Sequence, residues 1–361
     1  MLKKFTSLLL SFAVVGMAFT GCTVQGESSQ GAATQVEVAV ENGESNETSE
    51  ALSDTITVTD QLGREVVVPR EVNRIVSSYY ITSSLLIALG AEDRVVGLEM
   101  KADTREIYKV AAPEFLDLPA IGSGKSVNVE EILALDPDVV IIPYRLKEFI
   151  PQFEALNIPV IAVEPESMKN FLECVELIGT VIGAEERATE LANYYTSKME
   201  EVKALTKDVQ DKPKVYMSGG SSFLTTCTAN MYQNDLIEMA GGENVAGGLS
   251  DGYWANVSIE ELLVWNPEYI YSVGYASYGQ EEITGDVKLS NLSAVTSGNV
   301  YTFPSILEPW DYPTPSSVLG ILWLVNSLHP ELYTMEEYTE EAQNFYKTFF
   351  DIEVTPQDMG L

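Results

Sequence analysis

The sequence predicts an α/β fold made of two three-layer lobes with mainly parallel sheets, joined by one long helix. Three observations support this prediction. Short, continuous apolar runs alternate with helical patterns, which is typical of parallel sheets covered on both faces. Two stretches of the chain resemble each other, 130 residues apart, and a long helical pattern lies between them. Related lobes indicate a ligand held between them.

The internal duplication has two parts in the same order. Residues 127–142 align without a gap to 257–272, and residues 86–97 resemble 236–247. The copies differ in between, because 29 residues (98–126) in the first half correspond to nine (248–256) in the second. We expect ligand specificity where the copies differ. The identical pairs of the longer segment are Val127/Val257, Glu130/Glu260, Glu131/Glu261, Leu133/Leu263 and Pro137/Pro267.

The first residues have the form of a secretory signal. A basic start precedes a short apolar run that ends at Cys22, and the run is too short for a membrane-spanning helix. The segment resembles a bacterial lipoprotein signal, with a signal peptide over residues 1–21 and lipidation of Cys22. An ordinary signal with an incidental cysteine is the alternative. Residues 22–55 are polar and predict a flexible tether, so we expect an extracytoplasmic protein anchored to the cell membrane by lipid.

The N-terminal lobe is predicted over residues 56–183. It begins with a β-hairpin, and strands and helices then alternate. Apolar runs that end at turn residues mark the strands, and Gly90 and Pro137 end two of the helices. The predicted strands are 74–78, 139–143 and 159–163, and the predicted helices are 82–89, 129–135 and 150–156.

A helix over residues 168–182 is followed by the predicted lobe-spanning helix, 184–209, whose apolar residues recur at helical spacing. A connection by one helix resists bending, so we expect small lobe motions. The alternative is a surface helix of a single lobe. The C-terminal lobe is predicted over residues 210–361, with strands at 214–217, 269–273 and 300–303 and helices at 234–240 and 258–265.

Composition excludes several classes of function. The net charge of −33 argues against binding to nucleic acid. Cys174 and Cys227 could pair in an exported protein, but buried free thiols are the preferred interpretation. One histidine, His329, is too few for capture of a bare transition metal. A Ser-His-Asp hydrolase would have to use this histidine, which lies beside no obvious nucleophile in the sequence. We therefore expect no catalytic residue, no protein-held metal and no cofactor.

Several short motifs in a fixed order resemble the periplasmic-binding-protein family for iron chelates and cobalamin, over essentially all of residues 56–351. The resemblance implies a class III substrate-binding subunit of an ABC importer, a monomer whose partner is a permease dimer with its cytoplasmic ATPase. It also implies that Glu130 and Glu260 dock the permease; both can in addition stabilise their helices through the helix dipole. The motifs are residues 69–76, 89–97, 128–140, 240–245 and 315–323.

The ligand is expected at the carboxyl ends of the strands, where aromatic residues are frequent. Arg145 would bind an anionic group of the ligand, and a surface salt bridge is the rival interpretation. The predicted ligand is a chelated metal, namely a ferric siderophore, a corrinoid or haem. The alternatives are a molybdate-type oxyanion, a chelatase-type enzyme, and an adhesin or sensor without a cleft. The predicted ligand-binding residues are Tyr79, Tyr80, Tyr144, Arg145, Ser218, Trp254, Tyr275, Trp310 and Tyr312.

Overall fold

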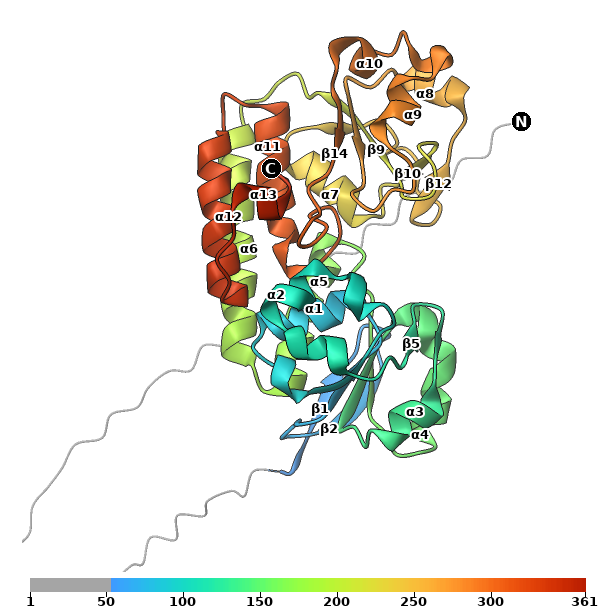
Figure 1. The fold of residues 1–361 in the computed structure, drawn as a ribbon, viewed down its shortest axis with the longest axis vertical. Coiled ribbons are helices and arrows are strands. Elements are labelled where there is room, and N and C mark those ends of the chain that lie inside the picture. Colours follow the sequence, from blue (N-terminus) through green and yellow to red (C-terminus); the bar gives the residue numbers. More distant parts are fainter. Residues whose placement is uncertain (1–52) are drawn as a thin grey trace, which may run out of the picture. The chain divides into compact units, whose positions relative to one another are not determined.

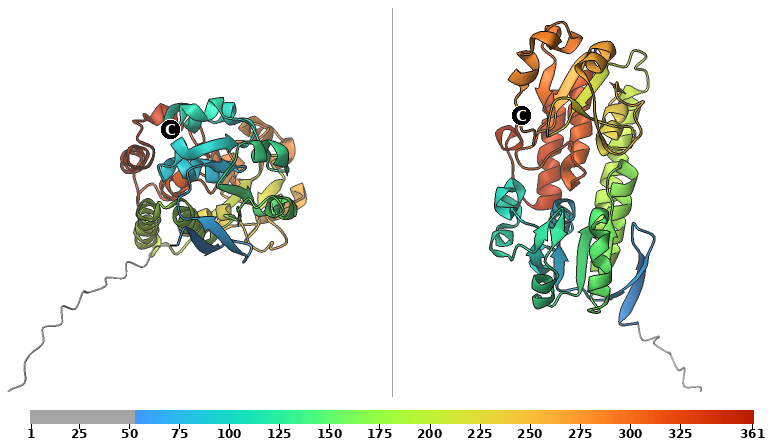
Figure 2. Two further views of the ribbon diagram at one scale, coloured as in Figure 1. Left: turned by 90° about the horizontal axis from the view of Figure 1, so that it is seen from below. Right: turned by 90° about the vertical axis from the view of Figure 1, so that its right-hand side faces the viewer.

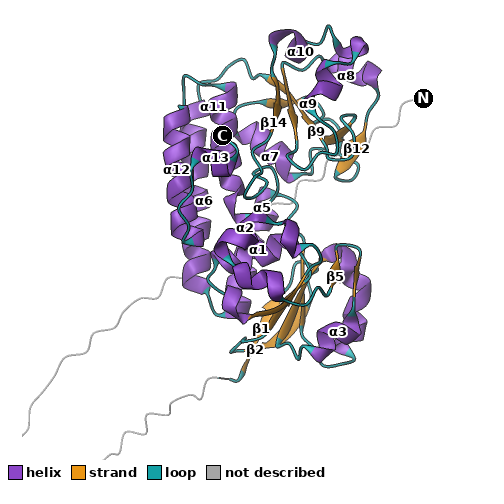
Figure 3. Ribbon diagram, viewed as in Figure 1, coloured by secondary structure: helices purple, strands orange, loops and turns teal. Residues whose placement is uncertain are grey.

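The computed structural model describes residues 53–361, which belong to one compact unit. The predicted signal peptide, the lipidation site Cys22 and nearly all of the predicted tether lie outside the described residues. In this unit no helix is long and apolar enough to cross a membrane. Helices surround two separate sheets (Figure 3).

The N-terminal half contains a four-stranded parallel sheet with strand order β4-β3-β7-β8. The predicted hairpin is confirmed, because β1 and β2 pair antiparallel. The elements of this half are β1 (Thr55–Thr59), β2 (Glu65–Pro69), β3 (Ile75–Ser77), α1 (Tyr80–Ala88), β4 (Val95–Leu98), α2 (Glu106–Ala111), β5 (Gly122–Ser123), β6 (Ser126–Val127), α3 (Val129–Ala134), β7 (Val139–Pro143), α4 (Ile150–Glu154), β8 (Val160–Val163) and α5 (Met168–Ile182).

The C-terminal half contains a six-stranded sheet in which β11, β9, β13 and β14 are parallel neighbours. Two antiparallel strands, β10 and β12, extend it and were not predicted. The elements after the connecting helix are β9 (Lys214–Ser218), β10 (Thr225–Cys227), α7 (Tyr232–Met239), β11 (Glu243–Asn244), β12 (Trp254–Asn256), α8 (Ile259–Trp265), β13 (Tyr269–Ser272), α9 (Gln280–Thr284), α10 (Ser293–Ser297), β14 (Val300–Thr302), α11 (Val318–Leu328), α12 (Met335–Phe350) and α13 (Pro356–Met359).

The two halves share one topology. The order β4-β3-β7-β8 matches β11-β9-β13-β14, strand for strand and in the same parallel sense. The duplicated segments fold alike: α3 and α8 each end at a residue with positive φ, Asp136 and Asn266, and each is followed by a proline and a central strand. The sequence duplication is therefore a structural duplication.

Each sheet has apolar side chains on both faces, which confirms the three-layer prediction. Along β7, Val139 and Ile141 join one core cluster, whereas Val140 and Ile142 join another. Along β13, Tyr271 joins the first of these clusters and Ile270 joins a third. The first cluster includes residues of both sheets, so one continuous apolar core runs through both halves.

The predicted connection by one long helix is confirmed as α6 (Glu185–Thr206), which at 1.5 Å per residue is about 33 Å long. The structure adds a second support, because α12 lies beside α6 (Figures 1 and 2) and contacts α1. Tyr194 of α6 packs on Phe345 and Phe349 of α12. The predicted domain boundaries stay predictions, because residues 52–361 form one unit. Cys174 and Cys227 are buried free thiols, as predicted.

Close packing of α5 on α6 depends on Gly179. A Cβ at this position would lie 2.3 Å from the Cβ of Ala188. We expect Gly179→Ala to lower the free energy of unfolding by about 1–3 kcal/mol, because overpacking outweighs the intrinsic preference of a helix for alanine. Urea unfolding measures this. Gly248→Ala is the matched control, since a Cβ there meets nothing within 4 Å; equal unfolding midpoints for the two variants would contradict the prediction.

Candidate functional site

Two cavities lie where the carboxyl ends of the strands of the two sheets approach each other. We call the first the cationic cavity, with a volume of about 530 Å³, and the second the acidic cavity, with a volume of about 650 Å³. The carboxyl ends of parallel strands are the usual position for ligands in open α/β sheets. Both volumes lie in the range of about 300–1,000 Å³ that is common for binding sites of organic molecules.

The cationic cavity takes residues from both halves of the unit. Its N-terminal wall follows β3, β4 and β7, and its C-terminal wall follows β13 and β14. The lining residues are Ser78, Tyr79, Tyr80, Glu99, Met100, Lys101, Arg105, Ser123, Gly124, Arg145, Tyr275, Pro309 and Tyr312.

Two guanidinium groups of this cavity stack on tyrosine rings. The Cζ of Arg105 lies 3.8 Å from the centroid of the Tyr80 ring, and the Cζ of Arg145 lies 4.6 Å from that of Tyr79. Such stacking fixes the guanidinium plane without using its hydrogen-bond donors. Within residues 53–361, neither arginine forms a salt bridge, nor does Lys101. The surface salt bridge considered for Arg145 is therefore absent from the described chain.

The position of Arg145 depends on Gly124. The Nε of Arg145 donates a hydrogen bond to the Gly124 carbonyl at 2.7 Å, and a Cβ on Gly124 would lie 2.7 Å from Nη2. Burial alone would lower the pKa of Arg145, but Tyr79, Tyr312 and Glu166 raise it overall. The guanidinium is therefore charged at every physiological pH.

Arg105 carries an unused donor. Its Nε is buried and has no hydrogen-bond partner in the described part of the chain. The carboxylate of Glu99, in the same cavity, is already engaged by the hydroxyls of Ser83 and Tyr108 at 2.7 and 2.8 Å. A buried unpaired donor is costly unless something occupies it, so this wall of the cavity is suited to an acceptor.

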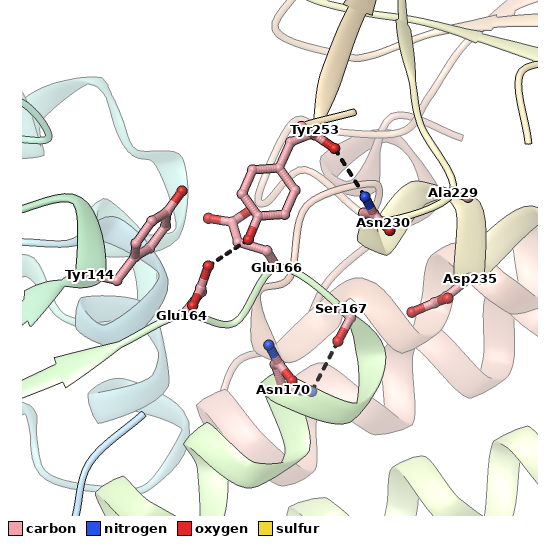
Figure 4. Close-up of a pocket in the computed structure, with 10 residues that line it drawn as sticks. Tyr144, Glu164, Glu166, Ser167, Asn170, Ala229, Asn230, Asp235 and Tyr253 are labelled. Carbon is pink, nitrogen blue, oxygen red and sulfur yellow. Dashed lines mark hydrogen bonds between the residues drawn. The ribbon is translucent and has the colours of Figure 1, made fainter. Parts of the chain in front are cut away.

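The acidic cavity adjoins the cationic one. The hydroxyl of Tyr79 donates to Glu166 at 3.3 Å and links the two. Burial raises the pKa of Glu166, and Arg145 partly offsets this. Across the cavity, the hydroxyl of Tyr253 donates to Glu164 at 2.5 Å and so joins the two halves (Figure 4). The lining residues are Tyr144, Glu164, Glu166, Ser167, Asn170, Ala229, Asn230, Asp235, Gly252 and Tyr253.

The loop after β14 carries two buried carboxyl groups beside the cationic cavity. Glu308 accepts hydrogen bonds from Ser84 of α1 and from Ser316, so it also joins the two halves. Burial raises its pKa to about 6, and these donors limit the shift. Asp311 is fully buried, and neither of its oxygens has a hydrogen-bond partner among the described residues. Burial raises its pKa to about 7.

Five predicted ligand residues lie together in the cationic cavity: Tyr79, Tyr80, Arg145, Tyr275 and Tyr312. Their role in binding remains a prediction.

The other four predicted residues lie elsewhere. Tyr144 lines the acidic cavity. Ser218 is buried because β10 pairs with β9 at this residue and covers the strand end. Trp310 is 1% exposed, and its indole N–H donates to the Tyr346 hydroxyl of α12 at 3.0 Å, so it belongs to the core. Trp254 lies on the edge strand β12 with its ring close to Gly219, and it lines neither cavity. Ser218, Trp254 and Trp310 are therefore not among the residues that line the two cavities, and their role in ligand binding stays a prediction.

Sequence reasoning missed Lys101 and Arg105. Both lie in residues 98–126, a segment of 29 residues that corresponds to only nine residues in the second copy. This segment supplies Glu99, Met100, Lys101, Arg105, Ser123 and Gly124 to the cavity. The sequence did contain a signal that could have identified these two residues. They are basic residues in a strongly acidic chain, and they lie in the segment that is longer in the first copy than in the second.

The two predicted docking residues occupy equivalent places outside both cavities. Glu130 and Glu260 are exposed in the first turns of α3 and α8. The glutamate that follows each of them takes part in a helix cap. The backbone N–H of Glu131 donates to the Asn128 side chain, and Glu261 forms a capping box with Ser258. Glu130 and Glu260 make no side-chain hydrogen bond or salt bridge within the described chain.

Among residues 53–361, no group of three or more His, Cys, Asp or Glu side chains is arranged to hold a metal ion. His329 is buried beyond the end of α11, with Nε2 3.4 Å from the Gly241 carbonyl.

Comparison with known proteins shows consistent similarity. Residues 75–307 match the family described as periplasmic binding protein. The molybdate-binding protein MolA of Haemophilus influenzae is 28% identical over 85% of this chain and 94% of its own sequence. The structure of MolA bound to molybdate has a TM-score of 0.75 at 27% identity, covering 83% of this chain and 99% of that one.

Two further relatives have names that refer to different ligands or to none. A periplasmic solute-binding protein from Veillonella parvula has a TM-score of 0.75 at 26% identity, covering 85% of this chain and 96% of that one. The high-affinity heme uptake system protein IsdE of Staphylococcus aureus is 26% identical over 55% of this chain and 70% of its own. The chain therefore belongs to the periplasmic binding protein family, and it is a solute-binding protein of an ABC transporter and not an enzyme.

Proposed function

We propose that the protein captures an anionic, organic metal chelate in the cationic cavity and delivers it to the permease. The observation that carries this proposal is the pair of stacked guanidinium groups, Arg105 and Arg145, neither of which forms a salt bridge within residues 53–361. In a chain of net charge −33, two basic side chains that line one cavity and keep donors available favour an anionic ligand.

The other walls favour an organic ligand over a bare ion. Tyrosine rings, Met100 and Pro309 supply apolar surface, and the hydroxyls of Ser78 and Ser123 supply polar contacts. A volume of about 530 Å³ suits a chelate better than a single small anion. The metal would arrive already coordinated, as in a ferric siderophore, a corrinoid or haem.

A molybdate-type oxyanion is the second candidate. It is favoured by the similarity to MolA and by the charge-assisted donors of Arg105, Arg145 and Lys101, which suit an anion of high charge density. The two candidates differ in the area they would cover. A chelate would contact the tyrosine rings, whereas an oxyanion would contact only the basic wall.

Titration with a panel of ligands separates these candidates. The panel contains ferric siderophores, cyanocobalamin, haem and sodium molybdate. Calorimetry and tryptophan fluorescence measure the binding of each ligand. We expect saturable binding of one chelate and no binding of molybdate at the same concentration. Saturable binding of molybdate alone would replace the chelate by the oxyanion, and a failure of all four classes would refute the proposed ligand type.

We further propose that Glu130 and Glu260 dock the permease dimer, whose cytoplasmic ATPase drives uptake, while a lipid on Cys22 holds the protein at the membrane. Two exposed carboxylates related by an internal duplication suit a two-fold partner, and charges at an interface rim set orientation and association rate. The absence of an internal partner for either carboxylate in the described chain supports this role.

Replacing both docking glutamates by alanine is expected to abolish ligand uptake by membrane vesicles and to leave ligand affinity unchanged. The reason is that both residues lie outside the cavities. The matched control is Glu268→Ala, an exposed glutamate outside both docking helices, which should transport normally. A loss of ligand affinity in the double variant would place the glutamates in ligand binding and contradict the assignment.

A further inference from the structure

Two leucines at equivalent places in α3 and α8 are exposed. Leu133 is 45% exposed and Leu263 is 39% exposed. Their neighbours in the same helices, Ile132 and Leu262, are buried in separate core clusters. Each helix thus buries one apolar residue in its own half and leaves the next one exposed.

The internal duplication provides a comparison within the protein. Five pairs are identical in the longer segment, and folding explains three of them. Val127 and Val257 are buried. Glu131 and Glu261 take part in the N-terminal caps of their helices. Pro137 and Pro267 follow the C-terminal ends of α3 and α8, where a proline disfavours continuation of the helix.

The remaining two pairs are Glu130/Glu260 and Leu133/Leu263. The glutamates can stabilise their helices through the helix dipole, but this does not explain why an exposed leucine accompanies each of them. The two pairs lie three residues apart in each helix, so they share one helix face. Two halves that differ at most positions have therefore kept an exposed carboxylate and an exposed leucine one helical turn apart, which points to a contact outside the fold.

We propose that Leu133 and Leu263 are apolar docking contacts for the permease, each entering an apolar depression one helical turn away from a basic residue of that partner. This proposal rests on the proposed docking role of Glu130 and Glu260, and it adds an apolar contact beside each of these glutamates. Charges at a rim steer and orient, whereas a buried apolar anchor contributes more to the lifetime of a complex. The combination gives each half the same contact with one subunit of a two-fold permease.

Val264 provides a matched control. It is 83% exposed and apolar on α8, but its counterpart in the first copy is Ala134, so the duplication does not keep it. It tests whether any exposed apolar residue of these helices contributes, or only the pair that both copies share.

The experiment measures binding of the protein to its permease–ATPase complex in proteoliposomes, for the parent chain, Leu133→Ala/Leu263→Ala, Val264→Ala and Glu130→Ala/Glu260→Ala. We expect the leucine double variant to raise the dissociation constant about tenfold or more, mainly through faster dissociation, and Val264→Ala to change it less than about twofold. Each single leucine variant should have a similar, smaller effect, because the contacts are equivalent. Affinity for the ligand should be unchanged throughout.

The outcomes distinguish the two proposals. If the glutamate variant weakens the complex and the leucine variant does not, the apolar contact is refuted and the docking surface stands. If neither variant weakens the complex, the docking role itself is wrong. If Val264→Ala weakens the complex as strongly as the leucine variant, the selective role of the duplicated leucines is refuted.

Discussion

Changing Arg105 and Arg145 together to alanine is expected to lower affinity for the ligand by about 100-fold or more. Each charge-assisted hydrogen bond contributes roughly 1.5–3 kcal/mol, and about 1.4 kcal/mol corresponds to tenfold in affinity. Both guanidinium groups line the same cavity. We therefore expect the double variant to lose the hydrogen bonds of both to the ligand, which makes the loss of affinity large. Calorimetry with the chelate or oxyanion that binds the parent protein measures the effect.

Conservative variants identify which property of the arginines matters. Arg105→Lys/Arg145→Lys keeps the charge but loses the planar stacking on Tyr80 and Tyr79, so we expect an intermediate loss. Tyr253→Phe removes a hydroxyl from the acidic cavity only and should leave the affinity within about twofold. An unchanged affinity in the double alanine variant would show that neither arginine binds the ligand and would refute the proposed site.

The second large effect concerns the dependence of stability on pH through Asp311. Its carboxyl is fully buried, and it faces the side chains of Gln233 and Tyr275 and the backbone N–H of Gly274. Within residues 53–361 the Oε1 of Gln233 also lacks a partner. Burial raises the pKa of the Asp311 carboxyl, and these polar neighbours offset the shift only in part, so the folded state retains the proton.

The sign follows from the raised pKa. Between the ordinary value of 3.8 and the folded value of about 7, the folded state keeps a proton that the unfolded state has released. Stability from this group therefore falls as the pH rises through this interval. A shift of this size corresponds to roughly 4 kcal/mol.

Asp311→Asn replaces the titratable carboxyl group by an amide of nearly the same shape, which cannot ionise and still has a hydrogen-bond donor. We expect the variant to gain stability over the parent protein as the pH rises from 4 to 8, by up to the magnitude given above. Urea unfolding at several pH values measures the difference. The control is Ser290→Ala, at an exposed residue without a titratable group, whose difference in stability from the parent should stay constant with pH. A constant difference for Asp311→Asn as well would contradict the shifted pKa.

Much of the fold could be read from local patterns. Helices α5 and α6 start at the predicted residues or within one of them, and β7 has the predicted bounds. The duplication predicted that the two halves would fold alike, and they share one strand order. The edge strands β10 and β12 and the return of α12 onto α1 could not be read, because they depend on contacts between residues far apart in the chain.

The candidate site was predicted in part for the same reason. A strand end followed by aromatic residues identified Tyr79, Tyr80, Tyr275 and Tyr312, because strand ends are a local property. The same rule failed for Trp310, since α12, some 36 residues further along, covers it and binds its indole N–H. Whether an aromatic side chain lines a cavity or fills a core is decided by what packs over it.

The sequence by itself determined the two-fold organisation of this protein, its family resemblance and the positions of its repeated helices. These depend on apolar periodicity and on turn residues, which act over a few positions. Only the tertiary structure decided that Arg105 joins Arg145 in one cavity and that the buried Asp311 carboxyl has no hydrogen-bond partner among residues 53–361. It also showed that Glu131 and Glu261 are used at the helix caps while Glu130 and Glu260 are free within the described chain. Burial and pairing are set by residues distant in sequence, so no local pattern encodes them.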